Sequence, residues 1–175
     1  MSIVFRYDPE RASHATRWLL ARHGGRLDRL KLIKLIFLAD RLHLARYGRP
    51  IVGGRYVAME HGPVASDFYN AIKGDTLEGT KQDGVRVECA VRPDEDFLSE
   101  TDLEVLREVN DQYGSFDTFR LRDMTHLLRA WGKNYKGENS SYPLPYEDFF
   151  EDLADEKQRA LGLISEGQEA ERVLG

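Results

Sequence analysis

The stretch that decides the fold is residues 29–46, which read RLKLIKLIFLADRLHLAR. We expect a helix here, Arg29–Arg46, because Asp28 can cap its first N–H groups and Gly48 follows its end near Tyr47. At about 100° per residue, its apolar side chains cover almost the whole circumference. They are Leu30, Leu32, Ile33, Leu35, Ile36, Phe37, Leu38, Leu42 and Leu44. A helix that is apolar nearly all round belongs in the centre of a bundle.

The charged residues of this helix divide between two directions. Lys31, Lys34 and Arg41 fall within one narrow arc, and we expect that arc to face solvent. Asp40 points the opposite way, among apolar side chains. A carboxylate in such surroundings must be paired or have a raised pKa. We therefore expect Asp40 to be structural, bound either to an arginine such as Arg41 or Arg55 or to backbone N–H groups.

Capping and turn residues divide the rest of the chain into helices and a few short strands. Further helices are expected over about 9–23, 62–72, 99–113, 118–131, 146–153 and 155–173. Extended segments are expected at 3–5, 51–59 and 85–91, and the last two could share a small sheet. The predicted fold class is α+β and predominantly α, with helices packed around the central helix and a small antiparallel sheet. We expect one domain over residues 1–175.

Composition and charge argue against a membrane protein, a secreted protein and a nucleic-acid-binding protein. The chain has 175 residues, of which 41% are hydrophobic, and one cysteine, Cys89. It contains no apolar run of the roughly 20 residues that a membrane span needs, and no signal-peptide core. We therefore expect a cytoplasmic protein without a membrane partner. Residues 1–60 carry a net charge of +7 and residues 61–175 one of −12, so a nucleic-acid partner is not expected.

Motifs that carry catalysis, cofactors or metals are missing from the sequence. It contains no P-loop, no dinucleotide-binding glycine pattern and no nucleophile elbow, and its histidines lack metal-ligand spacing. An acidic cluster, which we interpret as a solvated face rather than a calcium site, comprises Glu147, Asp148, Glu151, Asp152, Asp155 and Glu156. His126, on one predicted helix with Trp131, is expected to form a structural hydrogen bond. We expect no enzyme, cofactor or metal. A hydrolase that uses Asp40 or His126 is the catalytic alternative.

An ordered set of motifs resembles a known family. The run Leu30–Arg41 is similar to the signature helix of the Panacea family, the SocA-like antitoxin domain. The resemblance continues through Tyr47–Ile51, Tyr56–Ala58, His61–Val64, Leu98–Glu100, Tyr113-Gly114 and Thr125-His126 with Trp131. It covers about residues 10–135, whereas the acidic helical part at about 146–174 is less diagnostic.

The resemblance implies a role in a toxin–antitoxin system. Panacea proteins are bacterial antitoxins that are usually encoded beside a toxin, often in prophages, and their toxins are diverse. Many act by direct binding, and the SocA-like member is an adaptor that delivers its toxin to a AAA+ protease. The family is not known for an enzymatic activity. A DNA-binding repressor is a further alternative, and it predicts salt-dependent operator binding.

The residues around 55–64 are the first candidates for contact with a toxin. We expect Arg55, Tyr56, Glu60 and His61 to be exposed there, and Lys34 and Arg41 are further candidates on the basic arc. For Tyr56, Glu60 and His61, a role in fixing the fold is an equal alternative. Gly62 and Pro63 are expected to fix a strand-to-helix corner. They complete a structural motif together with Asp40, His126 and Trp131.

Overall fold

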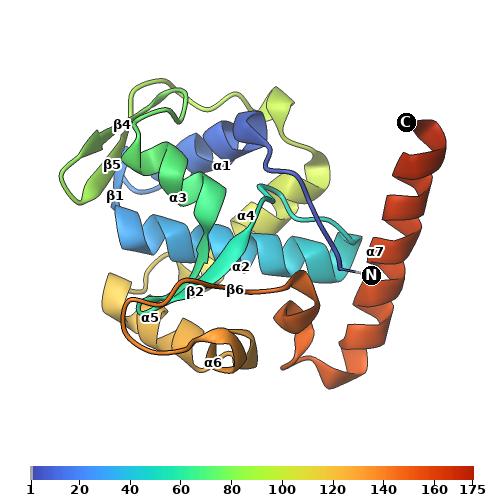
Figure 1. The fold of residues 1–175 in the computed structure, drawn as a ribbon. Helices are drawn as coiled ribbons and strands as arrows, with labels where there is room; N and C mark the ends of the chain where they lie inside the picture. Colours follow the sequence, from blue (N-terminus) through green and yellow to red (C-terminus); the bar gives the residue numbers. More distant parts are fainter. Residues whose placement is uncertain (1) are drawn as a thin grey trace.

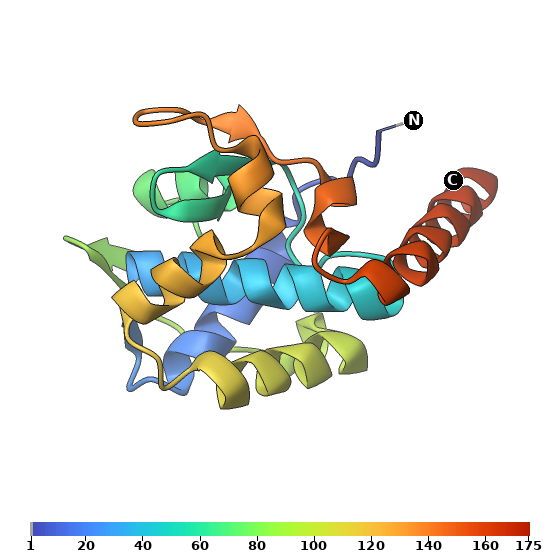
Figure 2. The ribbon, with the colours of Figure 1, turned by 90° about the horizontal axis from the view of Figure 1, so that it is seen from below.

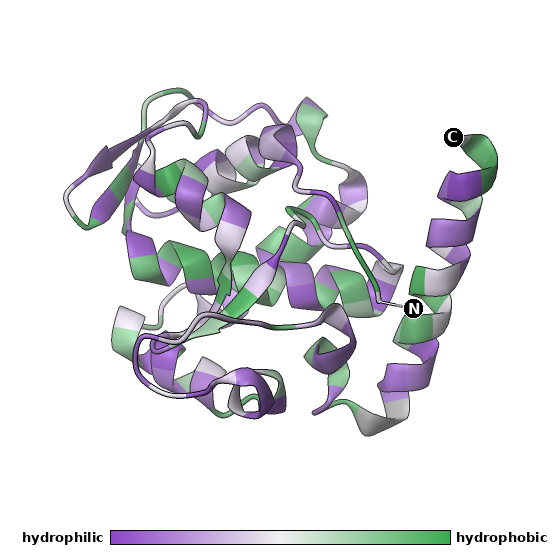
Figure 3. Ribbon diagram, in the orientation of Figure 1, coloured by the Kyte–Doolittle hydropathy of each residue, from purple (hydrophilic) through white to green (hydrophobic). Residues whose placement is uncertain are grey.

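Helix α2 (Arg29–Tyr47) runs through the middle of the molecule in the computed structural model, which describes residues 2–175 and all their side chains except those of residues 154 and 155 (Figure 1). Its N-cap, Asp28, accepts hydrogen bonds from the backbone N–H groups of Leu30 and Lys31. Gly48 ends the helix with a left-handed φ of 77°. Apolar residues gather along α2, and Leu32, Leu35, Phe37 and Leu44 have no exposed surface (Figure 3). The predicted central helix is therefore confirmed.

The other helices surround α2 or extend from its ends (Figures 1 and 2). They are α1 (Pro9–Ala21), α3 (Ser66–Lys73), α4 (Glu100–Tyr113), α5 (Thr118–His126), α6 (Arg129–Asn134) and α7 (Ala154–Leu174), with the 3-10 turns η1 (Glu95–Phe97) and η2 (Tyr146–Phe150). Helix α7 packs against α2 and its C-terminal end projects from the body (Figure 2). None of the helices within residues 2–175 has the length and apolar content needed to cross a bilayer.

Two small antiparallel sheets complete the fold. One has the order β1-β5-β4, and its strands are β1 (Arg26–Asp28), β4 (Thr80–Asp83) and β5 (Arg86–Cys89). The other has the order β3-β2-β6, and its strands are β2 (Tyr56–Met59), β3 (Gly62–Ala65) and β6 (Tyr142–Pro143). The predicted pairing of the 51–59 and 85–91 segments is therefore wrong. The first segment contributes β2, which pairs with β3 and β6, and the second contributes β5, which pairs with β1 and β4. The α+β fold class, predominantly α, is confirmed.

Three local expectations were also wrong. Residues 3–5 form no strand, although the N–H of Ile3 donates to Glu147 Oε1. The helix expected over 118–131 is interrupted between α5 and α6, where Leu127 lies in the solvent with 84% exposure. In the acidic cluster, Asp148 is 6% exposed and accepts hydrogen bonds from Lys133 and Asn134, so it is not solvated. The Asp155 side chain lies outside the described residues.

Candidate protein-binding pocket at the β2–β3 hairpin

Strands β2 and β3 form a hairpin whose two-residue loop is Glu60-His61. Met59 pairs with Gly62, and Gly62 takes the positive φ of 108° that the tight connection requires. Pro63 lies in β3, which is an edge strand and tolerates a residue without an N–H. The expectation that Gly62 and Pro63 begin a helix is therefore wrong, and the helix begins instead at Ser66.

Side chains from three helices hold the hairpin from beneath. Trp131 Nε1 in α6 donates to the backbone oxygen of Met59 at 2.7 Å. Lys34 Nζ in α2 donates to the backbone oxygen of Pro63 at 2.9 Å. Thr125 in α5 lies so near that a Cβ atom on Gly62 would stand 2.8 Å from Thr125 Oγ1 and 2.8 Å from Lys34 Nζ. The loop is exposed, but its base is fixed by the core.

The electrostatics beneath the hairpin are unusual because a lysine is fully buried there. Lys34 has no exposed surface, and burial lowers its pKa to about 7. Burial also lowers the pKa of His126, and the charge of Lys34 adds to this shift, whereas a hydrogen bond with the Glu60 backbone opposes it. The His126 ring stacks on Trp131 with 4.1 Å between centroids. These two residues thus meet across two consecutive helices rather than on one.

A second buried centre fixes the segment before β2. Asp40 accepts hydrogen bonds from the backbone N–H groups of Ile51 and Val52, both at 2.8 Å, and of Gly53 at 3.1 Å. The Tyr56 hydroxyl donates to the same carboxylate at 2.7 Å. Burial raises the pKa of Asp40 to about 6, although these hydrogen bonds oppose the shift. Asp40 was expected to bind either an arginine or backbone N–H groups. The structure shows backbone N–H groups bound to it, and neither Arg41 nor Arg55 does so.

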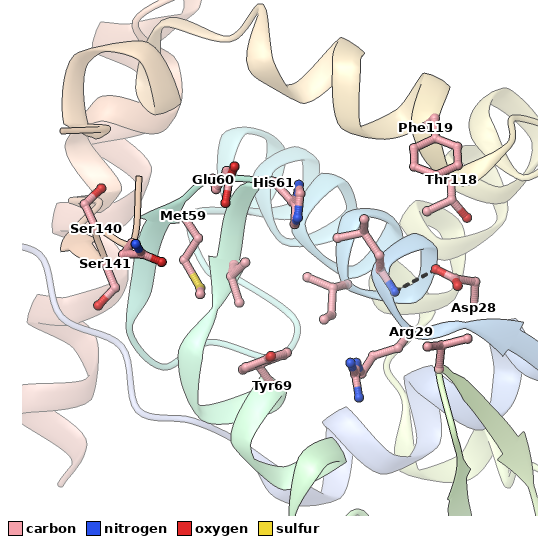
Figure 4. Close-up of a pocket in the computed structure, with 15 residues that line it drawn as sticks. Asp28, Arg29, Met59, Glu60, His61, Tyr69, Thr118, Phe119, Ser140 and Ser141 are labelled. Atoms are coloured by element: carbon pink, nitrogen blue, oxygen red, sulfur yellow. Dashed lines mark hydrogen bonds between the residues drawn. The ribbon is translucent and has the colours of Figure 1, made fainter. Parts of the chain in front are cut away.

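A pocket of about 530 Å³ opens beside the hairpin tip (Figure 4). It lies between the first turns of α2, the hairpin, α3, the start of α5 and the loop 139–141. Most of its floor is apolar, with Leu30, Ile33, Met59, Val64, Tyr69 and Phe119. Phe119 is 64% exposed, which is unusual for a large aromatic ring in a folded chain. A concave apolar surface of this kind suits the binding of another molecule.

The pocket carries a small number of charged groups. Arg29 lines it, and this guanidinium forms no ion pair within the described side chains. Its Cζ atom lies over the Tyr69 ring, 5.9 Å from the ring centroid. Asp28 is already the N-cap of α2. Glu60 and His61 belong to the exposed hairpin tip, and Figure 4 shows Glu60 well separated from Arg29. The pocket therefore presents one cation, Arg29, and two anions, Asp28 and Glu60, around an apolar floor.

The structure brings together only part of the predicted contact set. Glu60 and His61 line the pocket. Arg55 is exposed but lies outside it, 3.5 Å from Asp67. Arg41 is partly buried, and its Nε atom donates a hydrogen bond to the Phe149 backbone oxygen.

Two of the candidates are not at the surface at all. Tyr56 is 3% exposed and Lys34 is 0% exposed, so the expectation that both face solvent is wrong. The hairpin and its neighbours cover the basic arc of α2, which was expected to face solvent. All three basic side chains of that arc donate hydrogen bonds to backbone oxygens of other segments. The acceptors are Gly114 for Lys31, Pro63 for Lys34 and Phe149 for Arg41.

Of the residues that line the pocket, only Glu60 and His61 were predicted as contacts, and those that were missed include Arg29, Tyr69 and Phe119. Arg29 follows the N-cap and was interpreted only as the first residue of the helix. Phe119 did leave a signal, since it is a large aromatic between the polar Thr118 and Arg120 near the start of a helix. Among the described residues, no group of three or more His, Cys, Asp or Glu side chains is gathered to hold a metal ion.

The comparisons with known proteins identify a family. A family model described as "Antitoxin SocA-like, Panacea domain" matches residues 32–132. No curated protein and no solved structure matches the chain. The matched segment is more than half of the chain, and it includes Lys34, Asp40, the hairpin and Trp131. The chain therefore belongs to the SocA-like Panacea antitoxin domain family.

Proposed function

We propose that this chain is an antitoxin that neutralises a protein toxin, encoded beside it, by direct binding. Membership of an antitoxin-like domain family is the observation that carries the proposal. The structure adds a suitable surface, because the apolar pocket lies beside a hairpin fixed by Lys34 and Trp131. A surface that is already ordered loses less entropy on binding than a flexible one.

The hairpin pocket provides the kinds of side chain that dominate protein interfaces. Aromatic and arginine residues contribute most of the binding energy in typical interfaces, and here they are Tyr69, Phe119 and Arg29. A specific interface buries about 1,600 Å² in total. We therefore expect the toxin to cover the hairpin tip and the loop 139–141 as well as the pocket.

The proposal assigns no catalytic step to the chain. Asp40 is completely buried and its oxygens already accept four hydrogen bonds, which suits a structural carboxylate better than a general base. We expect His126→Ala to retain neutralisation, provided that circular dichroism shows the variant to be folded. Loss of neutralisation in a folded His126→Ala variant, with toxin binding unchanged, would support the catalytic alternative.

Co-expression tests the proposed function. The reading frame adjacent to this gene is placed under an inducible promoter, with or without this chain on a second plasmid, and colony growth is measured. We expect the adjacent product to stop growth alone and to be harmless with the chain. The same assay in strains without individual AAA+ proteases distinguishes direct binding, which persists, from delivery to a protease, which fails. A harmless neighbour, or unchanged toxicity, contradicts the proposal.

A further inference from the structure

We infer that the hairpin pocket receives an apolar segment of the toxin that carries a carboxylate toward Arg29 and a cation toward Glu60. This inference rests on the proposed function and specifies the chemistry of the partner at that site. It starts from the apolar surface that the fold leaves uncovered. Phe119 and Val85, at the pocket, are 64% and 62% exposed. Covering such side chains is favourable because it removes apolar surface from water.

The unpaired arginine selects an anionic group. Arg29 is the first residue of α2, and no carboxylate within the described side chains lies within ion-pair distance of it. The neighbouring Asp28 cannot readily turn toward it, because its Oδ1 atom accepts from two backbone N–H groups at the start of the helix. The 19-residue helix also places the positive end of its dipole here. Asp28 already occupies this positive end, so a partner carboxylate would be attracted by the Arg29 guanidinium rather than by the end of the helix.

The hairpin tip selects the opposite charge. Glu60 is exposed, and it forms no ion pair among the described side chains. Arg29 and Glu60 come from different elements and lie apart in Figure 4, with Met59 and Tyr69 in the same pocket. A segment bound in the opposite direction would place its cation near Arg29 and its carboxylate near Glu60. Because like-charge contacts at an interface are unfavourable, this arrangement fixes the direction in which a segment binds.

The pocket can keep this arrangement because its walls are held rigidly. The hairpin is anchored through the Met59 and Pro63 carbonyl oxygens, and Ile33 and Val64 on the floor are 2% and 5% exposed. Arg29 is therefore placed by the central helix, and the hairpin that carries Glu60 at its tip is held at its base by the core. Charge reversal at the rim should change binding without changing the fold.

The test uses charge reversal with a matched control. Arg29→Glu and Glu60→Lys reverse the two rim charges, and Phe119→Asp places a charge on the apolar surface. Arg107→Glu is the control, because Arg107 is exposed on α4, lies outside the pocket and forms no ion pair within the described side chains. Each variant is checked by circular dichroism and thermal unfolding. Its affinity for the purified product of the adjacent reading frame is then measured by calorimetry.

We expect the three pocket variants to bind about 10- to 100-fold more weakly, and the control to bind within about twofold of the wild type. Selection for toxin variants that Arg29→Glu again neutralises should yield substitutions of an acidic residue by lysine or arginine. Wild-type affinity in all three pocket variants overturns this inference and leaves the antitoxin role intact. If the wild-type chain does not bind the adjacent product, the proposed function fails, and this inference fails with it.

Discussion

The Nζ atom of Lys34 lies 2.9 Å from the backbone oxygen of Pro63, so a buried cation on the central helix holds the strand beside the exposed hairpin tip. This contact joins two segments of the family-matched region that are far apart in the sequence. Trp131 makes the equivalent contact on the other strand through the Met59 oxygen. The buried contacts of the fold thus determine the shape of the surface that we propose to be functional.

The burial of Lys34 predicts a dependence of stability on pH. Its pKa is lowered from 10.5 to about 7 in the folded chain. Between these values the unfolded chain binds a proton that the folded chain lacks, so stability rises with pH by up to about 1.4 kcal/mol per pH unit. Below pH 7 both states hold the proton and the cost of burying the charge is complete.

Lys34→Met should remove this rise, so the free energy of unfolding of the wild type should increase relative to that of the variant as pH increases from 7 to 10. Urea denaturation at several pH values measures these free energies of unfolding. Lys73→Met, which changes an exposed lysine on α3, is the control and should parallel the wild type. A constant difference between Lys34→Met and the wild type over this range would show that Lys34 keeps its ordinary pKa.

Gly62 should be far less tolerant of a side chain than another glycine of positive φ. Alanine at Gly62 combines a φ of 108° with contacts of 2.8 Å to Lys34 and Thr125. Gly84, with a φ of 59° and open space around it, provides the matched control. We expect Gly62→Ala to lower the free energy of unfolding by about 3 kcal/mol and Gly84→Ala by about 1 kcal/mol. Equal losses in denaturation experiments would mean that the base of the hairpin is loosely packed.

Asp40 should be sensitive even to its nearest isostere. In Asp40→Asn, the side-chain NH₂ group would face one of the present donors, such as the Gly53 N–H, and leave it unpaired. An unpaired buried donor costs about 1–3 kcal/mol, and Tyr56→Phe, which removes a hydrogen bond to a carboxylate, should cost about 1.5–3 kcal/mol. Thermal unfolding measures both losses. An Asp40→Asn variant as stable as the wild type would argue against the backbone hydrogen bonds described here.

Trp131→Phe should loosen the hairpin locally. The substitution keeps an aromatic ring against His126 but removes the Nε1–H donor to Met59. Loss of about 1 kcal/mol corresponds to roughly fivefold faster hydrogen exchange of the amides in β2 and β3. Trp18→Phe is the control, because the Trp18 Nε1–H donates to Glu95, outside the hairpin. The exchange rates of the hairpin amides are compared with those of the α2 amides in each variant. If both variants speed exchange in the hairpin equally, the Trp131 contact has no local role.

Local signals predicted much of the fold. The cap at Asp28 and the glycine at Gly48 act within a few residues, and they begin and end the central helix as predicted. The nearly continuous apolar surface of residues 29–46 correctly indicated a buried helix, because periodicity reports burial directly. These features need no knowledge of distant segments.

Long-range contacts could not be predicted in the same way. A helical wheel shows that Lys34 shares an arc with other cations, but not that a hairpin covers this arc. Gly62-Pro63 resembles a helix start because proline suits the first turn, yet pairing with Ala58 places it in a strand. The pocket combines Arg29, Tyr69 and Phe119 from three helices, and only the folded chain brings them together.

The most direct test of the central claim uses two purified proteins, this chain and the toxic product of the adjacent reading frame. They are mixed without protease or ATP, separated by size-exclusion chromatography and assayed for the toxin's activity. The account predicts that they co-elute as a stable complex in which the toxin is inactive, and that Arg29→Glu weakens this complex whereas Arg107→Glu does not. Separate elution, with the toxin fully active in an excess of this chain, would contradict it.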